Sequence, residues 1–252
     1  VPSLAESWET IDDKTTVFHL RHGVKFHNGE EMTSEDVKYS LERCIASDGV
    51  NYNYLIIDTI TCNGDYTVTI TTKEPFNALL PRLTLDAASI ICKSADTSPE
   101  KFNQNPVGAG PYKFVSWDLG GDVVLEAFDD YYKGAPAIKR IIFRTIPEAI
   151  NRSVGLETGE VDLAYDLGIS DLESLKGNPD VTTMTTPSNT VWYLGMNVRK
   201  APLNDVKVRQ AIAYALNPQD YIDIVFSGEP TLAHNTMLPT GVYAYSRGGE
   251  LL

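Results

Sequence analysis

Three of the four histidines lie close together near the start of the sequence, at positions 19, 22 and 27. Imidazole nitrogens ligate zinc and act as catalytic bases, so this cluster raises the question of a metal or catalytic site. The alternation of apolar and polar residues predicts two strands, Thr15–Leu20 and Val24–His27, joined by a turn at His22-Gly23. Such a hairpin could bring His19 and His27 together across the strands. A zinc site needs three or four converging ligands, and nothing in the pattern fixes a third, so a metal site is not favoured.

The other nucleophiles and carboxylates give no catalytic signature. Cys44, Cys62 and Cys92 form no C-x-x-C pair, and Cys44 and Cys92 are predicted to be small buried hydrophobic residues, although a single disulfide stays open. The acidic pairs Glu30-Glu31 and Asp129-Asp130 are typical of solvated surface. No spacing singles out two carboxylates for acid and base roles, but a paired-carboxylate hydrolase stays open as an alternative.

The charge balance excludes some partners. The chain has 34 acidic and 21 basic residues and a net charge of −13, so phosphate backbones would repel it and nucleic acid is not expected as a partner. It contains no apolar run long enough to span a membrane. It begins at Val1 without a signal-peptide pattern, which suggests a processed or trimmed piece.

The elements that must position any site begin with hairpins. Thr33, with Asp36 three residues later, predicts a capped helix whose apolar face includes Val37, Leu41 and Cys44. Further hairpins are predicted over 59–72, around Asn63-Gly64-Asp65, and over 112–128.

The second part of the chain alternates strands with helices. The predicted strands cover 138–143, 161–165, 181–186 and 190–197, and the predicted helices cover 147–158, 170–177, 205–216 and 218–228. In the predicted helix over 147–158, Ile150 and Val154 are expected to face inward. Hairpins followed by this alternation predict an α/β protein with a hairpin-rich lobe and a second lobe on a mixed sheet.

Aromatic residues near loops and strand ends suggest a ligand cleft, because aromatic side chains commonly line binding pockets. Ordinary core and surface positions are an equally good interpretation for each of them alone. These residues are Tyr52, Tyr54, Trp192, Tyr193, Tyr243 and Tyr245.

Three blocks of the sequence together resemble one family. They are "LAESWETIDDKTTVFHLRHGVKFHNGEEMTSEDVKYSLER" (4–43), "NPVGAGPYKFVSWDLGGDVVLEAFDDYYKGAP" (105–136) and "YLGMNVRKAPLNDVKVRQAIAYALNPQDYI" (193–222). In order and approximate spacing they are similar to the extracytoplasmic solute-binding proteins of peptide- and nickel-type ABC importers, bacterial solute-binding protein family 5. In this family the histidine-bearing segment is structural. Position 132 is Tyr where many members have Trp, which changes no functional expectation.

The resemblance implies a fold like that of the type II periplasmic-binding proteins, with mixed sheets, a hairpin-rich extension region and two lobes that close on a ligand. Members of the family are much longer, so this chain is expected to be a fragment with an incomplete two-lobe clamp. The implied regions are 1–136 as the extension of the first lobe, 137–238 as part of that lobe, and 239–252 as the start of the second.

The resemblance also implies a function. The protein would be the monomeric substrate-binding component of an ABC importer, capturing short peptides and delivering them to a permease. It would not be an enzyme, would need no cofactor or metal, and would work outside the cytoplasm, in the periplasm or anchored by lipid to the cell membrane. The implied ligand-binding residues are Asn189, Thr190, Trp192 and Tyr193, with Tyr52, Tyr54 and Tyr243 carried over more loosely.

The ligand stays open within the family, where a nickel chelate, an oligosaccharide or another small solute is the alternative to a peptide. From other classes, a secreted hydrolase and a module for adhesion or assembly remain as alternatives.

Overall fold

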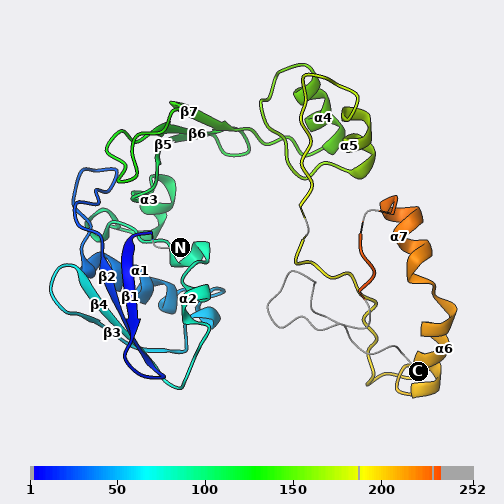
Figure 1. Cartoon of the computed structure of the whole chain (residues 1–252), viewed down its shortest axis with the longest axis horizontal. Helices are drawn as coiled ribbons and strands as arrows, with labels where there is room; N and C mark the ends of the chain where they lie inside the picture. Colours follow the sequence, from blue (N-terminus) through cyan, green and yellow to red (C-terminus); the bar gives the residue numbers. More distant parts are fainter. Residues whose placement is uncertain (1–2, 187, 229, 234–252) are drawn as a thin grey trace. The chain divides into compact units, whose positions relative to one another are not determined.

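A computed structural model describes residues 3–186, 188–228 and 230–233 of the chain (Figure 1). The chain forms two compact units, Val1–Thr145 and Ile146–Leu252. Each unit is described below by itself.

The first unit begins with a four-stranded antiparallel sheet in the order β1-β2-β4-β3. Strand β2 lies in its interior and alternates as predicted, with Thr16, Phe18 and Leu20 buried. Strand β4 shows the same alternation and buries Val68 and Ile70. Alternate residues of a strand face the same side of the sheet. The strands are β1 (Ala5–Thr10), β2 (Thr15–Leu20), β3 (Ile57–Cys62) and β4 (Thr67–Thr72).

Helix α1 (Ser34–Ala46) packs against β3 and β4, and its N-terminal cap is the predicted one. The Asp36 carboxylate accepts hydrogen bonds from the backbone N–H of Thr33 at 2.9 Å and from its hydroxyl at 3.0 Å. These bonds fix the start of the helix. Val37, Leu41 and Cys44 then fall on the buried face, as the helical spacing predicts.

The segment Val24–His27 is not a strand, so the predicted hairpin with β2 is wrong. The two neighbours of β2 are β1 and β4, whereas this segment folds into a tight loop with a single bridge between Lys25 and Glu31. The N–H of Phe26 donates to the Glu30 carbonyl at 2.8 Å. Val24 and Phe26 are fully buried, so the alternation that suggested a strand reflects two side chains entering the core from a loop.

Short helices follow α1 and β4 in the first unit. They are η1 (Asn51–Asn53), α2 (Leu79–Arg82), η2 (Asp86–Ala88), η3 (Lys93–Ala95) and α3 (Pro99–Gln104). The first, η1, lies between α1 and β3, and the other four lie between the two sheets along the chain. The last of them, α3, is followed by the loop at 105–111, which precedes the second sheet.

The second sheet of this unit has three antiparallel strands, β5 (Tyr112–Trp117), β6 (Val123–Ala127) and β7 (Arg140–Phe143). The β5–β6 hairpin is the predicted one. The predicted buried strand at 138–143 is shorter, and Ile142 and Phe143 are half exposed rather than buried. Strand β7 completes this sheet, and the first unit ends at Thr145. The extension region over 1–136 that the resemblance implies stays a prediction.

The second unit contains four helices among its described residues: α4 (Ala149–Glu157), α5 (Ile169–Leu175), α6 (Val206–Ala215) and α7 (Pro218–Phe226). All four were predicted, with shifts of one or a few residues at their ends. Asp205 and Asn217 cap α6 and α7 by accepting from the N–H groups of Lys207 and Gln219. Gly159 follows α4 with a φ of +72°, a conformation that suits glycine at a helix end.

Two expectations for the second unit are corrected. The segments 161–165, 181–186 and 190–197 form no strands, because no described residue pairs with them in a ladder. Ile150 and Val154 are exposed, whereas the face of α4 that is covered contains Ser153 and Gly155. The Cβ of an alanine at Gly155 would contact Val161, so the covered face packs closely on the following segment.

Candidate functional site

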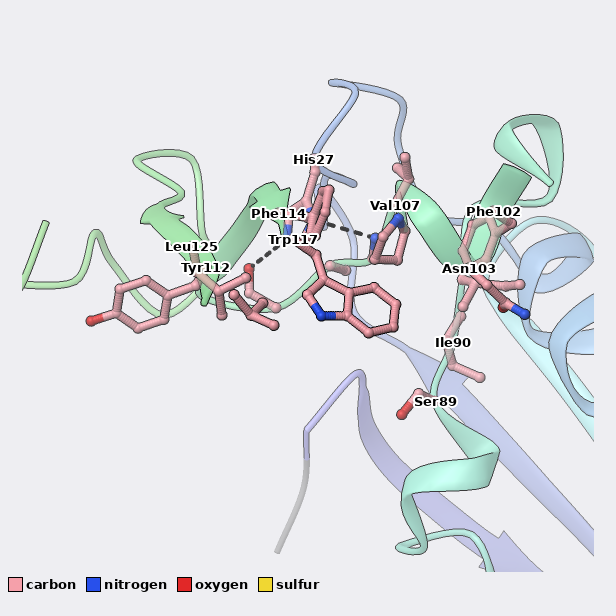
Figure 2. A pocket seen from close by; sticks show the side chains of 16 residues that line it. His27, Ser89, Ile90, Phe102, Asn103, Val107, Tyr112, Phe114, Trp117 and Leu125 are labelled. Carbon is pink, nitrogen blue, oxygen red and sulfur yellow. Dashed lines mark hydrogen bonds between the residues drawn. The ribbon is translucent and has the colours of Figure 1, made fainter. Parts of the chain in front are cut away.

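A pocket of about 560 Å³ lies in the first unit, between the three-stranded sheet and the segments that precede it (Figure 2). One wall is the apolar face of β5 and β6, where Phe114 pairs with Leu125 and Trp117 pairs with Val123. The opposite side is formed by Phe102 of α3 and by the loop at 105–111. A volume of this size would admit a small molecule or a large side chain.

His27 forms part of the pocket wall, and both nitrogens of its ring are hydrogen-bonded to one loop. Nδ1 lies 3.3 Å from the backbone N of Gly108, and Nε2 lies 3.0 Å from the carbonyl oxygen of Gly110 (Figure 2). A backbone N–H can only donate, so Nδ1 must accept and Nε2 must carry the proton. Burial lowers the pKa of the imidazole, a hydrogen bond to Gly110 opposes this, and the charge of Lys113 adds to the lowering.

The three clustered histidines do not converge. His19 lies on β2, 3.3 Å from the Glu9 carboxylate, and His22 stacks on Tyr66 with 3.8 Å between ring centroids. His27 faces the loop at 108–110, so the hairpin arrangement that could have brought its ring to His19 does not occur. Among the described residues, no group of three or more His, Cys, Asp or Glu side chains is arranged to hold a metal ion.

The acidic side chains of the two pairs contact cationic or hydrogen-bonding neighbours. Asp130 lies 2.8 Å from Lys25 and Asp129 lies 3.1 Å from Lys139. Glu31 accepts from the Tyr66 hydroxyl at 2.7 Å and from the N–H of Gly23 at 2.8 Å, and these hydrogen bonds lower its pKa. A general acid of a glycosidase needs a raised pKa, so Glu31 has the opposite electrostatics.

The predicted aromatic residues of the first unit differ in their exposure. Tyr52 lies in η1 and is 70% exposed, so it is available to a ligand. Tyr54 is only 1% exposed, and its hydroxyl donates to the Arg82 carbonyl at 3.3 Å. This burial argues against Tyr54 as a ligand contact, because its ring is part of the core.

The predicted ligand-binding segment of the second unit is exposed. Asn189 and Thr190 lie on the surface, and Trp192 and Tyr193 are 79% and 70% exposed. The Trp192 ring lies 6.0 Å from that of Phe226, which follows from the return of α7 to this segment. Tyr243 lies outside the described residues. The structure therefore leaves Asn189, Thr190, Trp192 and Tyr193 accessible as a group along one segment.

The cysteines carry no site. All three are free thiols, and Cys44 and Cys92 are buried as predicted. The Cys44 thiol donates to the Ala87 carbonyl, and burial raises its pKa. A thiol in this state is a poor nucleophile.

The fold and its relatives place the chain in a class and then in a family. The class is that of α/β solute-binding proteins: the structure of NikZ from Campylobacter jejuni in complex with Ni(L-His) matches 93% of this chain and 48% of that one, with a TM-score of 0.80 and 27% identity. The family profile described as bacterial extracellular solute-binding proteins, family 5 Middle, matches residues 1–250. The chain belongs to this family.

Two curated relatives show how far the match extends. A dipeptide-binding protein of Escherichia coli K12 is 33% identical over 95% of this chain and 50% of its own length. A glutathione-binding protein of Pectobacterium atrosepticum is 35% identical over 93% of this chain and 47% of its own length. The chain thus spans about half the length of these relatives.

Family membership settles the broad class. The expected α/β fold of the type II periplasmic-binding kind is confirmed, and coverage of about half of each relative agrees with an incomplete clamp. The relatives are binding proteins and not enzymes, so the hydrolase alternative is set aside. Among the described residues, no helix is both long and apolar enough to cross a bilayer.

The pocket of the first unit was missed from the sequence. The segment 103–111, rich in Gly, Pro and Asn, carries no sequence pattern that indicates a pocket. Simple alternation would place Phe114 and Trp117 on opposite faces of β5, but the register shifts between Phe114 and Ser116, and both side chains line the pocket. This irregularity leaves no signal in the local pattern.

Proposed function

We propose that the protein is the substrate-binding component of an ABC importer and captures short peptides outside the cytoplasm. The observation that carries the proposal is the 33% identity to a dipeptide-binding protein over nearly the whole chain. The glutathione-binding relative supports the same class of ligand, because glutathione is itself a tripeptide. The partner would be the transmembrane permease of the importer, and the protein would act as a monomer, either in the periplasm or anchored by lipid at the membrane surface.

In this proposal the first unit supplies the extension region and the second supplies part of the first lobe, with the rest of the clamp formed by the longer protein. A ligand that contacts both lobes would stabilise the closed arrangement over the open one. Peptides would be held mainly through backbone hydrogen bonds, with their side chains in roomy, hydrated pockets.

The proposed contacts of the second unit are Asn189, Thr190, Trp192 and Tyr193, with Tyr52 added from the first unit. The exposed indole of Trp192 offers a large, flat, apolar surface, and ordering it on binding costs little side-chain entropy. Tryptophan side chains of this kind often contribute most of the binding energy at an interface.

Replacement of Trp192 by alanine in the intact protein is expected to weaken binding of di- and tripeptides by at least about tenfold, which corresponds to about 1.4 kcal/mol. Titration calorimetry measures the change. The matched control is Tyr214→Ala, which removes another exposed aromatic side chain of the same unit, 82% exposed on α6, and should leave the affinity unchanged. Equal losses in both variants would contradict the proposed role of Trp192.

A nickel chelate is the second candidate, because the C. jejuni relative was determined with Ni(L-His). The same calorimeter separates the two ligands when nickel with excess histidine replaces the peptides. Strong binding of the chelate and none of the peptides would keep the family and replace the substrate.

A further inference from the structure

His27 is placed where its protonation state decides how one wall of the pocket is held. Its two ring nitrogens make bonds of opposite polarity to the same loop: Nδ1 accepts from Gly108 and Nε2 donates to Gly110. Its own backbone N–H donates to the Gly108 carbonyl at 2.9 Å. One residue therefore makes three hydrogen bonds to a loop of three small residues, as Figure 2 shows for the ring.

The loop has independent support on its other side. The N–H of Cys92 donates to the Val107 carbonyl at 3.1 Å, and Ile91 and Gly108 form a bridge. The loop is therefore held between the strand-like segment at 91–92 and His27. The support from residues 91–92 and the backbone bond from His27 do not involve the ring, so they stay in place whatever its protonation state.

Protonation changes only one of the two ring bonds. An imidazolium carries a hydrogen on both nitrogens, so Nδ1 can no longer accept from Gly108. The Nδ1–H group then points at the backbone N–H of Gly108, and two donors face each other. The bond from Nε2 to Gly110 remains available. The consequence is local, because it falls on the backbone of Gly108, which lines the pocket.

The surroundings of the ring do not compensate the added charge. Lys113 on β5 is the charged side chain that acts on the imidazole, and its own partner is Glu126 on β6, at 2.8 Å. Asp130 is paired with Lys25, and Glu30 accepts from Asn28 and Ser94. The Phe128 ring meets His27 edge-on, with 5.2 Å between the ring centroids, and offers no charge.

We propose that His27 is a pH-sensitive latch, which fastens the Gly108–Gly110 loop through both ring nitrogens while neutral and loosens it at Gly108 when protonated in acid. The folded state holds the ring neutral below the pH at which an unfolded chain would protonate it. The stabilisation is therefore complete above about pH 6.5 and is lost as the pH falls through the lower pKa of the folded protein.

Hydrogen exchange measured by mass spectrometry on the intact protein tests the latch. Between about pH 7.5 and a pH at which His27 is protonated in the folded protein, after correction for the intrinsic exchange rates, a peptide covering 105–111 should lose protection by roughly fivefold, the effect of one lost hydrogen bond. His27→Gln keeps one acceptor and one donor but does not titrate, so its protection should not change with pH. The control His22→Gln removes a histidine outside the pocket and should behave like the unsubstituted protein.

A second measurement needs no variant. Nitrogen chemical shifts of labelled histidine in the intact protein report which ring nitrogen carries the proton at each pH. The latch predicts a proton on Nε2 at neutral pH and a pKa below the ordinary value of about 6.5. A proton on Nδ1, a pKa at or above that value, or an equal loss of protection in His27→Gln would overturn the proposal.

Discussion

Replacing Phe26 with alanine is expected to lower the free energy of unfolding by about 3–5 kcal/mol. The Phe26 side chain has no exposed surface, and it lies in the same core cluster as Val24, Met32 and Leu41. Removing the ring loses the favourable free energy of burying it and leaves a cavity. The loop around Phe26 can fill this cavity only in part, because hydrogen bonds to Glu30 and Gly29 hold its backbone in place. Denaturation by urea, followed by tryptophan fluorescence, measures the loss.

Two further variants make this result specific. Phe26→Leu keeps most of the buried volume and should cost clearly less than Phe26→Ala. Leu119→Ala removes a side chain that is 88% exposed in the β5–β6 turn and should change the stability by less than about 0.5 kcal/mol. If Phe26→Ala were as mild as Leu119→Ala, the segment 24–27 would not enter the core as described.

Replacing Asp96 with alanine is expected to cost roughly 2–3 kcal/mol. The Asp96 side chain is 2% exposed, and one of its oxygens accepts from Arg43 at 2.8 Å and from the Tyr39 hydroxyl at 2.9 Å. Loss of the carboxylate leaves both donors without this acceptor. The Arg43 side chain is 31% exposed, so water can solvate its guanidinium in place of the lost carboxylate. The expected cost in stability is therefore lower than for a fully buried ion pair.

The control for this ion pair is Asp129→Ala. Asp129 pairs with Lys139 at 3.1 Å, but both side chains are mostly exposed, so its loss should cost no more than about 1 kcal/mol. Thermal unfolding of both variants beside the unsubstituted protein gives the comparison. Equal costs for Asp96→Ala and Asp129→Ala would show that burial does not strengthen the first pair.

The parts of the fold that were predicted correctly are those set by neighbouring residues. The Thr33–Asp36 cap, the Asn217-Pro218 helix start and the hairpin around Asn63-Gly64-Asp65 depend on side chains a few positions apart. Their physics is contained in a short window of sequence, so pattern and propensity suffice.

The errors come from elements whose state depends on distant partners. Val24 and Phe26 alternate as a strand would, yet β1 and β4 already occupy both edges of β2. The segments 181–186 and 190–197 also have strand-like patterns, and no described residue pairs with them. A strand exists only with a partner, and the local pattern does not reveal whether one is available.

Among the candidate ligand-binding residues, Asn189 and Thr190 come from the family resemblance alone, whereas the aromatic ones are also suggested by their places near loops and strand ends. Composition and spacing alone left Tyr52 and Tyr54 equivalent, and only the packing distinguishes the exposed ring from the buried one. The role of His27 was also hidden, because the distance from His27 to Gly108 and Gly110 along the chain is large and glycine carries no side-chain signal. Hydrogen bonds between a side chain and a backbone group far away in the sequence can be identified only from the structure.

The central claim, that the protein captures short peptides, is tested most directly by its natural cargo. The intact protein would be purified without added ligand and denatured, and the released small molecules would be identified by mass spectrometry. We expect a set of intact peptides of a few residues. Release of a nickel chelate or a sugar in their place, with no peptide, would contradict the claim.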